Sequence, residues 1–157
     1  MLRRITEAKE RKDEGFSLVE LLVVIIIIGI LAAIAIPVFM NQRGKANDTA
    51  AKADVSTIGK EIATLWVDNA TLGGLTVAQA SGRWTMTYSG LSTPMDLGPV
   101  SNGVLPGATP LTVVVEPGSS ESDISRNDWC VWVTHPEGTD KDFRYTANGG
   151  IEKGSCS

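Results

Sequence analysis

The stretch that decides the fold is GFSLVELLVVIIIIGILAAIAIPVFM, residues 15–40. Its last twenty residues, Leu21 to Met40, carry no charge, and a helix of that length measures about 30 Å, the thickness of a bilayer's hydrocarbon core. The β-branched run at residues 22–28 would suit a strand in water, but a lone strand in lipid leaves its backbone groups without partners. The stretch therefore predicts one membrane-spanning helix.

The flanks of this stretch indicate its orientation. Residues 1–15 hold five basic and four acidic side chains, and the basic ones favour a cytoplasmic N-terminus. Three further basic residues, Arg43, Lys45 and Lys52, follow the span and weaken that asymmetry. We expect the N-terminus inside and the rest of the chain outside.

Three interpretations of the span compete on the residues alone. It could be a cleaved signal peptide with Ala33-Ile34-Ala35 as a small-residue cleavage site, or a plain anchor. The third gives a role to Glu20 and Pro37, which neither of the others needs. A buried charged carboxylate costs several kcal/mol without a partner, and a proline removes one helical N–H.

The order of residues from Glu14 to Ile25 closely resembles the processing site and N-terminal helix of type IV prepilins. In that family a dedicated membrane peptidase cuts after the glycine and then methylates the new N-terminal residue. The resemblance implies that residues 1–15 are a leader, that cleavage falls between Gly15 and Phe16, and that Phe16 becomes N-methylated. It is close as far as about Asn41 and looser beyond.

The resemblance also implies how subunits assemble. In a bundle of apolar helices Glu20 would be an isolated buried charge, and its cheapest partner is the N-terminal amine of a neighbouring subunit's Phe16. Such a pair fixes the axial register, as one polar residue does in a coiled coil. The alternative to this pairing is that Glu20 merely lies in the lipid headgroup region. Gly29 and Pro37 stand where pilins commonly carry glycine and proline, for close helix approach and local loosening.

Beyond the span the chain keeps helical character but becomes amphipathic. Five residues, at spacings of 4, 3, 4 and 3, form one apolar stripe: Ala51, Val55, Ile58, Ile62 and Leu65. The charged residues off that stripe are expected in solvent: Lys52, Asp54, Lys60, Glu61 and Asp68. One helix is therefore predicted from about Phe16 to about Asn69, weakened at Gly59 by roughly 1 kcal/mol relative to alanine.

The C-terminal half predicts short strands. Alternation or β-rich composition marks residues 83–88, 111–116, 129–134 and 143–147, and Asn148-Gly149-Gly150 is a tight turn into a further strand. Ser89 to Pro110 is expected to be loop. The fold class is thus α+β: a long N-terminal helix packed on an antiparallel sheet of three to five strands. The predicted division is leader 1–15, filament-core helix 16–41, amphipathic helix 42–72 and head 73–157.

Cys130 and Cys156 lie near the ends of the last region, which is outside the cytoplasm on this topology. A bridge between them is the natural inference in an oxidising compartment, and it resembles the disulfide that closes the C-terminal region of many pilins. Two free thiols are the alternative. Two cysteines and a distant His135 do not form a metal-ligand spacing, so we expect no metal and no cofactor.

The chain shows no pattern typical of an enzyme or a nucleic-acid-binding protein. His135 precedes a proline and is expected to lie exposed in a loop, without a catalytic role. A net charge of −4 argues against a nucleic-acid surface. Two acidic clusters are more typical of solvated loops than of calcium sites: Glu121, Asp123 and Asp128, and Asp140 and Asp142.

The leading hypothesis is a non-enzymatic subunit of a type IV pilus that serves adhesion, motility or DNA uptake. Its expected partners are further copies of itself in a helical homopolymer, the prepilin peptidase, the assembly platform with its ATPase motor, and the membrane. The precursor would sit in the cytoplasmic membrane and the filament outside the cell. The alternatives are a pseudopilin of a type II secretion or competence machine, an anchored binding domain that never assembles, and a secreted enzyme.

Overall fold

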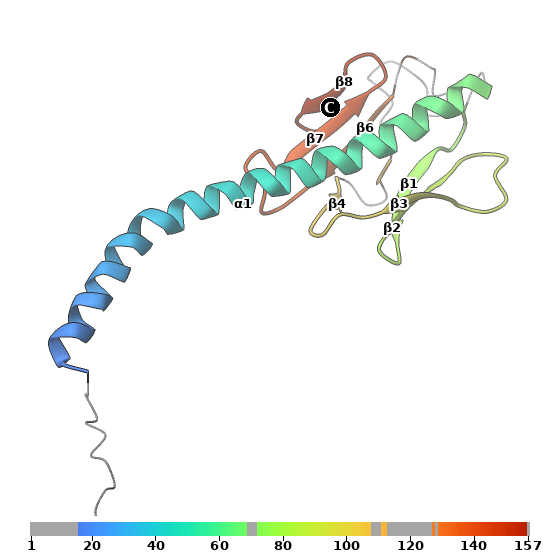
Figure 1. Cartoon of the computed structure of the whole chain (residues 1–157). Coiled ribbons are helices and arrows are strands. Elements are labelled where there is room, and N and C mark those ends of the chain that lie inside the picture. The colour runs from blue at the N-terminus through green and yellow to red at the C-terminus, as the bar shows by residue number, and fades with distance from the viewer. Residues whose placement is uncertain (1–15, 69–71, 108–110, 113–126, 128, 157) are drawn as a thin grey trace, which may run out of the picture. The chain divides into compact units, whose positions relative to one another are not determined.

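The computed structural model describes residues 16–68, 72–107, 111–112, 127 and 129–156 (Figure 1). The predicted leader, with Gly15, lies outside this range, as do Glu121, Asp123, Asp128 and the last four residues of the strand predicted at 111–116. The chain divides into two compact units, residues 1–39 and 40–157.

One helix dominates the N-terminal half. Helix α1 runs from Leu18 to Asp68, within two residues of the predicted ends, and continues through Pro37. In the first unit its large apolar side chains are all exposed, because nothing in that unit covers them. By length and composition it is the one helix in the described part of the chain that could span a membrane.

In the second unit α1 becomes the backbone of a folded core. The predicted stripe is confirmed: Ala51, Val55, Ile58 and Ile62 are fully buried, and Leu65 packs against them at the margin. Gly59, one residue after Ile58, lies under the ring of Tyr145, where a Cβ would come within 2.5 Å of Cδ1. The glycine costs helix propensity but allows the strand bearing this ring to approach the helix.

The strands form two antiparallel sheets of four strands each, rather than the single sheet predicted (Figure 1). The first has the order β3-β2-β1-β5, with β1 at Thr76–Ala80, β2 at Arg83–Thr87, β3 at Met95–Pro99 and β5 at Leu111–Thr112. The second has the order β4-β6-β7-β8, with β4 at Leu105–Pro106, β6 at Cys130–Thr134, β7 at Asp142–Thr146 and β8 at Gly150–Lys153.

The predicted loop from Ser89 to Pro110 is wrong in part, since it contains β3 and β4. Both are poor in β-branched residues, and β3 carries Gly98 with φ +122° and ends at Pro99. It pairs with β2 across a register shift between Trp84 and Thr85, so its pairing depends on its neighbour rather than on its own sequence.

Both sheets contribute to one core against α1. Its fully buried residues from the strands are Val77, Trp84, Met86, Val131, Val133 and Phe143. In β2 the buried Trp84 and Met86 alternate with Arg83, Thr85 and Thr87, which confirms the predicted half-buried strand.

Asp54 corrects the predicted solvent face of α1. It is only 5% exposed, and its carboxylate accepts hydrogen bonds from Trp84 Nε1 (2.9 Å), Ser101 N (2.9 Å) and Ser101 Oγ (2.6 Å). A buried carboxylate is tolerated where donors of this kind replace its water. Asp54 therefore joins α1 to both β2 and the segment that follows β3.

Candidate processing and assembly site

The N-terminus of α1 begins with a reciprocal capping box. Glu20 N–H donates to Ser17 Oγ (3.2 Å), and Ser17 N–H donates to Glu20 Oε2 (2.9 Å). Two backbone donors that a helix start leaves without partners are thereby satisfied. Glu20 thus has a partner within its own chain, a role that the sequence analysis missed although Ser-x-x-Glu is the capping-box pattern.

The capping box fixes where the helix starts relative to Phe16, the residue that follows the candidate cleavage site. Because α1 begins at Leu18, Phe16 and Ser17 are outside the helix, and the Phe16 side chain is 82% exposed. Glu20 is also exposed, in the first turn. The arrangement leaves an acid and two non-helical residues at one end of an uncovered apolar helix.

Gly29 and Pro37 both lie inside the first unit's helix. A Cβ built on Gly29 meets nothing within 4 Å, so a neighbouring helix could approach its backbone closely. Pro37 removes one helical N–H, yet α1 continues through it. The assembly roles of these two residues stay predictions.

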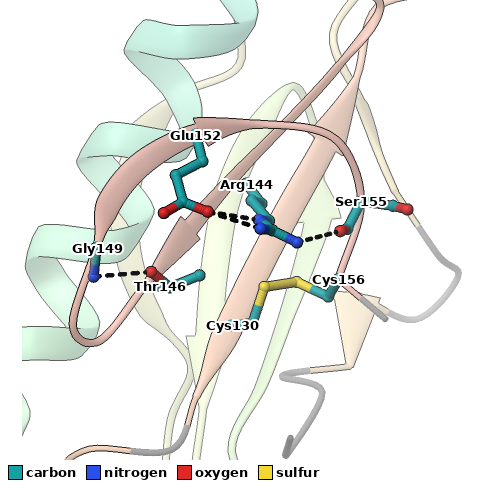
Figure 2. Close-up of a disulfide and its surroundings, with 7 residues drawn as sticks. All are labelled: Cys130, Arg144, Thr146, Gly149, Glu152, Ser155 and Cys156. Carbon is teal, nitrogen blue, oxygen red and sulfur yellow. Dashed lines mark hydrogen bonds and ion pairs between the residues drawn. A yellow bond between two sulfur atoms is a disulfide. The ribbon is translucent and has the colours of Figure 1, made fainter.

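The disulfide between Cys130 and Cys156 is present, and it ties the C-terminal tail to β6. Figure 2 shows the guanidinium of Arg144 between Glu152 and Ser155. Its Nε and one terminal nitrogen donate to Glu152 Oε2 (2.9 and 2.7 Å), and the other donates to the carbonyl of Ser155 (3.1 Å). The edge strand β8 and the tail are thus held by one covalent bond and one forked ion pair.

The turn between β6 and β7 is anchored to α1 by polar contacts. Arg43 pairs with the Glu137 carboxylate at 2.8 Å, and Asn47 Nδ2 donates to the Glu137 carbonyl at 3.2 Å. The buried carboxylate of Asp48 accepts from Asp140 N–H at 3.2 and 3.3 Å. Asp48 showed no apolar periodicity and could not be distinguished by sequence from a solvated helix residue.

His135 lies at the start of this turn, and the expectation that it is exposed is wrong. Its side chain is 3% exposed and contacts the backbone of two segments. Proline after a histidine indicates a turn but does not say which way the ring points. The ring points inward, towards Asn102.

Two exposed groups have pKa values shifted by their ion pairs. The Arg83 guanidinium that hydrogen-bonds Asp96 lowers the pKa of that carboxyl, and the Gly98 N–H lowers it further. The hydrogen bond to Asp140 raises the pKa of the Lys153 ammonium. Asp140 is thus held by Lys153, and Asp142 begins β7. The described residues contain no cluster of three or more His, Cys, Asp or Glu that could hold a metal ion.

Comparison with known proteins identifies the N-terminal segment. Residues 11–36 match the prokaryotic N-terminal methylation motif. The chain is 38% identical over 61 residues to the type II secretion system core protein G of Pseudomonas aeruginosa, covering 39% of this chain and 43% of that protein. It is 44% identical over 59 residues to the type IV wide pilus major component PilA4 of Thermus thermophilus, covering 38% and 45%.

A further relative is the type IV major pilin protein PilA of Myxococcus xanthus, 43% identical over 47 residues, or 30% of this chain and 21% of that protein. The chain thus aligns with less than half the length of each of these relatives. No solved structure matches the chain significantly. The methylation motif, the apolar helix and the antiparallel sheets together make the chain similar to type IV pilins and to type II secretion core protein G, with the sequence match confined to less than half of its length.

Proposed function

We propose that the chain is a non-enzymatic structural subunit of a type IV pilus, assembled as a helical homopolymer after cleavage between Gly15 and Phe16 and methylation of Phe16. The observation that carries the proposal is Glu20: an acid in the first turn of an apolar helix, within the matched methylation motif. The capping box uses one oxygen of this carboxylate within the chain, so the pairing role is supported by the second oxygen and by the position of Glu20 within the matched motif.

The exposed surface of the first unit supports polymerisation. The large apolar side chains from Leu18 to Met40 are uncovered, so they need lipid or the helices of other subunits around them. Since lipid supplies no hydrophobic driving force between helices, close backbone approach at Gly29 and polar pairing supply the specificity. Surface imaging and the phenotype of cells without the gene would decide whether the filament serves adhesion, motility or DNA uptake.

Glu20 is suited to pair with a neighbouring subunit. One of its oxygens, Oε2, accepts the Ser17 N–H, and the other remains available for a cation. Cleavage before Phe16 creates a positive amine, and that amine of an adjacent subunit would neutralise the acid while fixing the axial register.

The topology and partners follow from the same features. The precursor would sit in the cytoplasmic membrane with its N-terminus inside, because residues 1–15 carry five basic side chains. The disulfide supports an oxidising compartment for the second unit, which is the outside on this topology. The prepilin peptidase would process the chain, and an assembly platform driven by an ATPase would extract it into the extracellular filament.

A pseudopilin of a type II secretion or competence machine is the second candidate. The match to the type II secretion system core protein G of Pseudomonas aeruginosa favours it as strongly as the pilin matches favour a pilus. Electron microscopy of cells with and without the gene separates the two, since long abundant surface filaments indicate a pilus.

Mass spectrometry of the mature protein tests the processing step. We expect a chain that begins at a methylated Phe16, whereas an intact Met1 or a start after Ala35 would contradict the proposal. Glu20→Ala should abolish filaments while the protein still accumulates in the membrane. Glu61→Ala, an exposed acid on the same helix, is the matched control and should leave assembly unchanged. Assembly that survives Glu20→Ala would favour an anchored domain that never polymerises.

A further inference from the structure

His135, the only histidine of the chain, is held in one tautomer by its surroundings. The backbone N–H of Glu137 donates to Nδ1 at 3.3 Å, so Nδ1 carries a lone pair. The proton is therefore on Nε2, which lies 3.1 Å from the carbonyl oxygen of Asn102 and donates to it. The neutral imidazole thus bridges two backbone segments, using each nitrogen once.

Packing around the ring leaves it no alternative position. Gly103 has φ +80°, and a Cβ at that residue would lie 2.5 Å from Nε2 and 2.8 Å from Cε1. The ring therefore fits only because residue 103 has no side chain. It cannot swing away to find another acceptor without moving the turn that contains Asn102.

Glu137 connects this ring to α1. Its N–H binds the imidazole, its carbonyl accepts from Asn47, and its carboxylate pairs with Arg43. All three contacts are made by Glu137, so the position of its backbone decides whether its contacts with Asn47 and Arg43 on α1 can form. His135 helps to fix that position through the hydrogen bond to the Glu137 N–H.

The ring is buried but not sealed from water. His135 lines a groove of about 500 Å³ together with Arg43, Asn47, Asn102, Leu105 and Glu137. A proton from solvent can therefore reach Nδ1 through this groove. The charged groups around it come from α1 and from the β6–β7 turn, and they oppose one another: Arg43 and Lys141 are cationic, whereas Asp48, Glu137 and Asp140 are anionic.

We propose that His135 is an acid-sensitive latch that holds the β6–β7 turn on α1. In acid, a proton from water takes the lone pair of Nδ1, and the imidazolium then has two donors and no acceptor. Its new N–H faces the N–H of Glu137, so the hydrogen bond between them is lost. Glu137 then moves away from α1, its contacts with Arg43 and Asn47 break, and the groove widens, while the hydrogen bonds from Asp140 N–H to Asp48 still hold the far end of the turn. This inference does not depend on how the chain assembles.

The full-length chain in a non-ionic detergent tests the latch between pH 7.5 and 5.5. With ¹⁵N-labelled histidine, the ring gives one pair of signals that report its protonation. Amide hydrogen exchange at Glu137 is measured in parallel and corrected for its intrinsic pH dependence. We expect the corrected exchange rate at Glu137 to rise at least tenfold on acidification, while exchange at Val133 in β6 stays unchanged. The midpoint of this rise should coincide with the midpoint of the change in the ring signals.

His135→Gln is the matched variant, because its amide can still donate and accept but does not titrate. Its exchange at Glu137 should be flat across the same range. Three results would overturn the latch: a ring that stays neutral down to pH 5.5, a ring that titrates while exchange at Glu137 is constant, or an equal rise in the glutamine variant. If that variant does not fold, the two midpoints in the wild-type chain still decide.

Discussion

Replacing Gly59 by alanine should destabilise the second unit, although alanine is the better helix former. An added Cβ would lie 2.5 Å from Cδ1 and 2.7 Å from Cδ2 of Tyr145, so the ring would have to withdraw by about 1 Å to reach ordinary contact. It has little room to do so, because it stacks on the buried Trp129 with ring centres 5.8 Å apart.

The magnitude follows from two opposing effects. Helix propensity favours Gly59→Ala by about 1 kcal/mol, whereas overpacking a filled site costs about 1–3 kcal/mol. The difference is a net loss of up to about 2 kcal/mol in the free energy of unfolding. In a Tyr145→Ala background the clash is gone, so the same substitution should instead gain about 1 kcal/mol.

Urea unfolding in a non-ionic detergent gives the free energy of unfolding of four oxidised full-length proteins: the wild-type chain, Gly59→Ala, Tyr145→Ala and the double variant. All four tryptophans lie between residues 66 and 132, so their fluorescence reports the second unit and not the apolar helix. If Gly59→Ala stabilises the wild-type chain as much as the Tyr145→Ala chain, the ring does not pack on this glycine and the reasoning is refuted.

Three further changes test other contacts. Asp54→Asn should cost about 2–4 kcal/mol in the same unfolding assay, because an amide cannot accept from all three buried donors; Asp96→Asn, at an exposed ion pair, should change the midpoint little. Serine at Cys130 and Cys156 together should cost about 3.5 kcal/mol by the chain-entropy relation, and an unchanged midpoint would show that the tail is held without the disulfide. The raised pKa of Lys153 means that its ion pair stabilises the fold below the ordinary lysine pKa, and this stabilisation is lost as the pH rises through the folded value. Asp140→Asn should therefore shift the side-chain NMR titration of Lys153 to lower pH.

The helix was predictable to within two residues because two separate patterns agree. Uninterrupted apolar residues define its first half, and the spacing from Ala51 to Ile62 defines its second. Strands β2, β6 and β7 were predicted for the same reason: each carries enough alternation or β-branched residues to fix its own face. Where the local sequence pattern and the tertiary environment favour the same structure, the element can be predicted from the sequence.

The rest depends on partners that are distant in the chain. Asp54 reads as a solvent residue because its donors, Trp84 and Ser101, are 30 and 47 residues away. His135 is buried for a similar reason, since Asn102 is 33 residues distant. Strand β4 has two residues, and no local pattern predicts its pairing with β6 at the edge of the second sheet. For these features the packing of distant segments overrides local preference.

The capping box at Ser17 has a consequence for proteolysis. Peptidases generally need their target in an extended form, and a helix that grew backwards by one turn would coil the junction before Phe16 into its own hydrogen-bond ladder. A hydroxyl and a carboxylate that close the ladder at Leu18 prevent that growth. On the proposed processing, the pair of side chains that starts the helix would thus also keep the bond before Phe16 within reach of a peptidase.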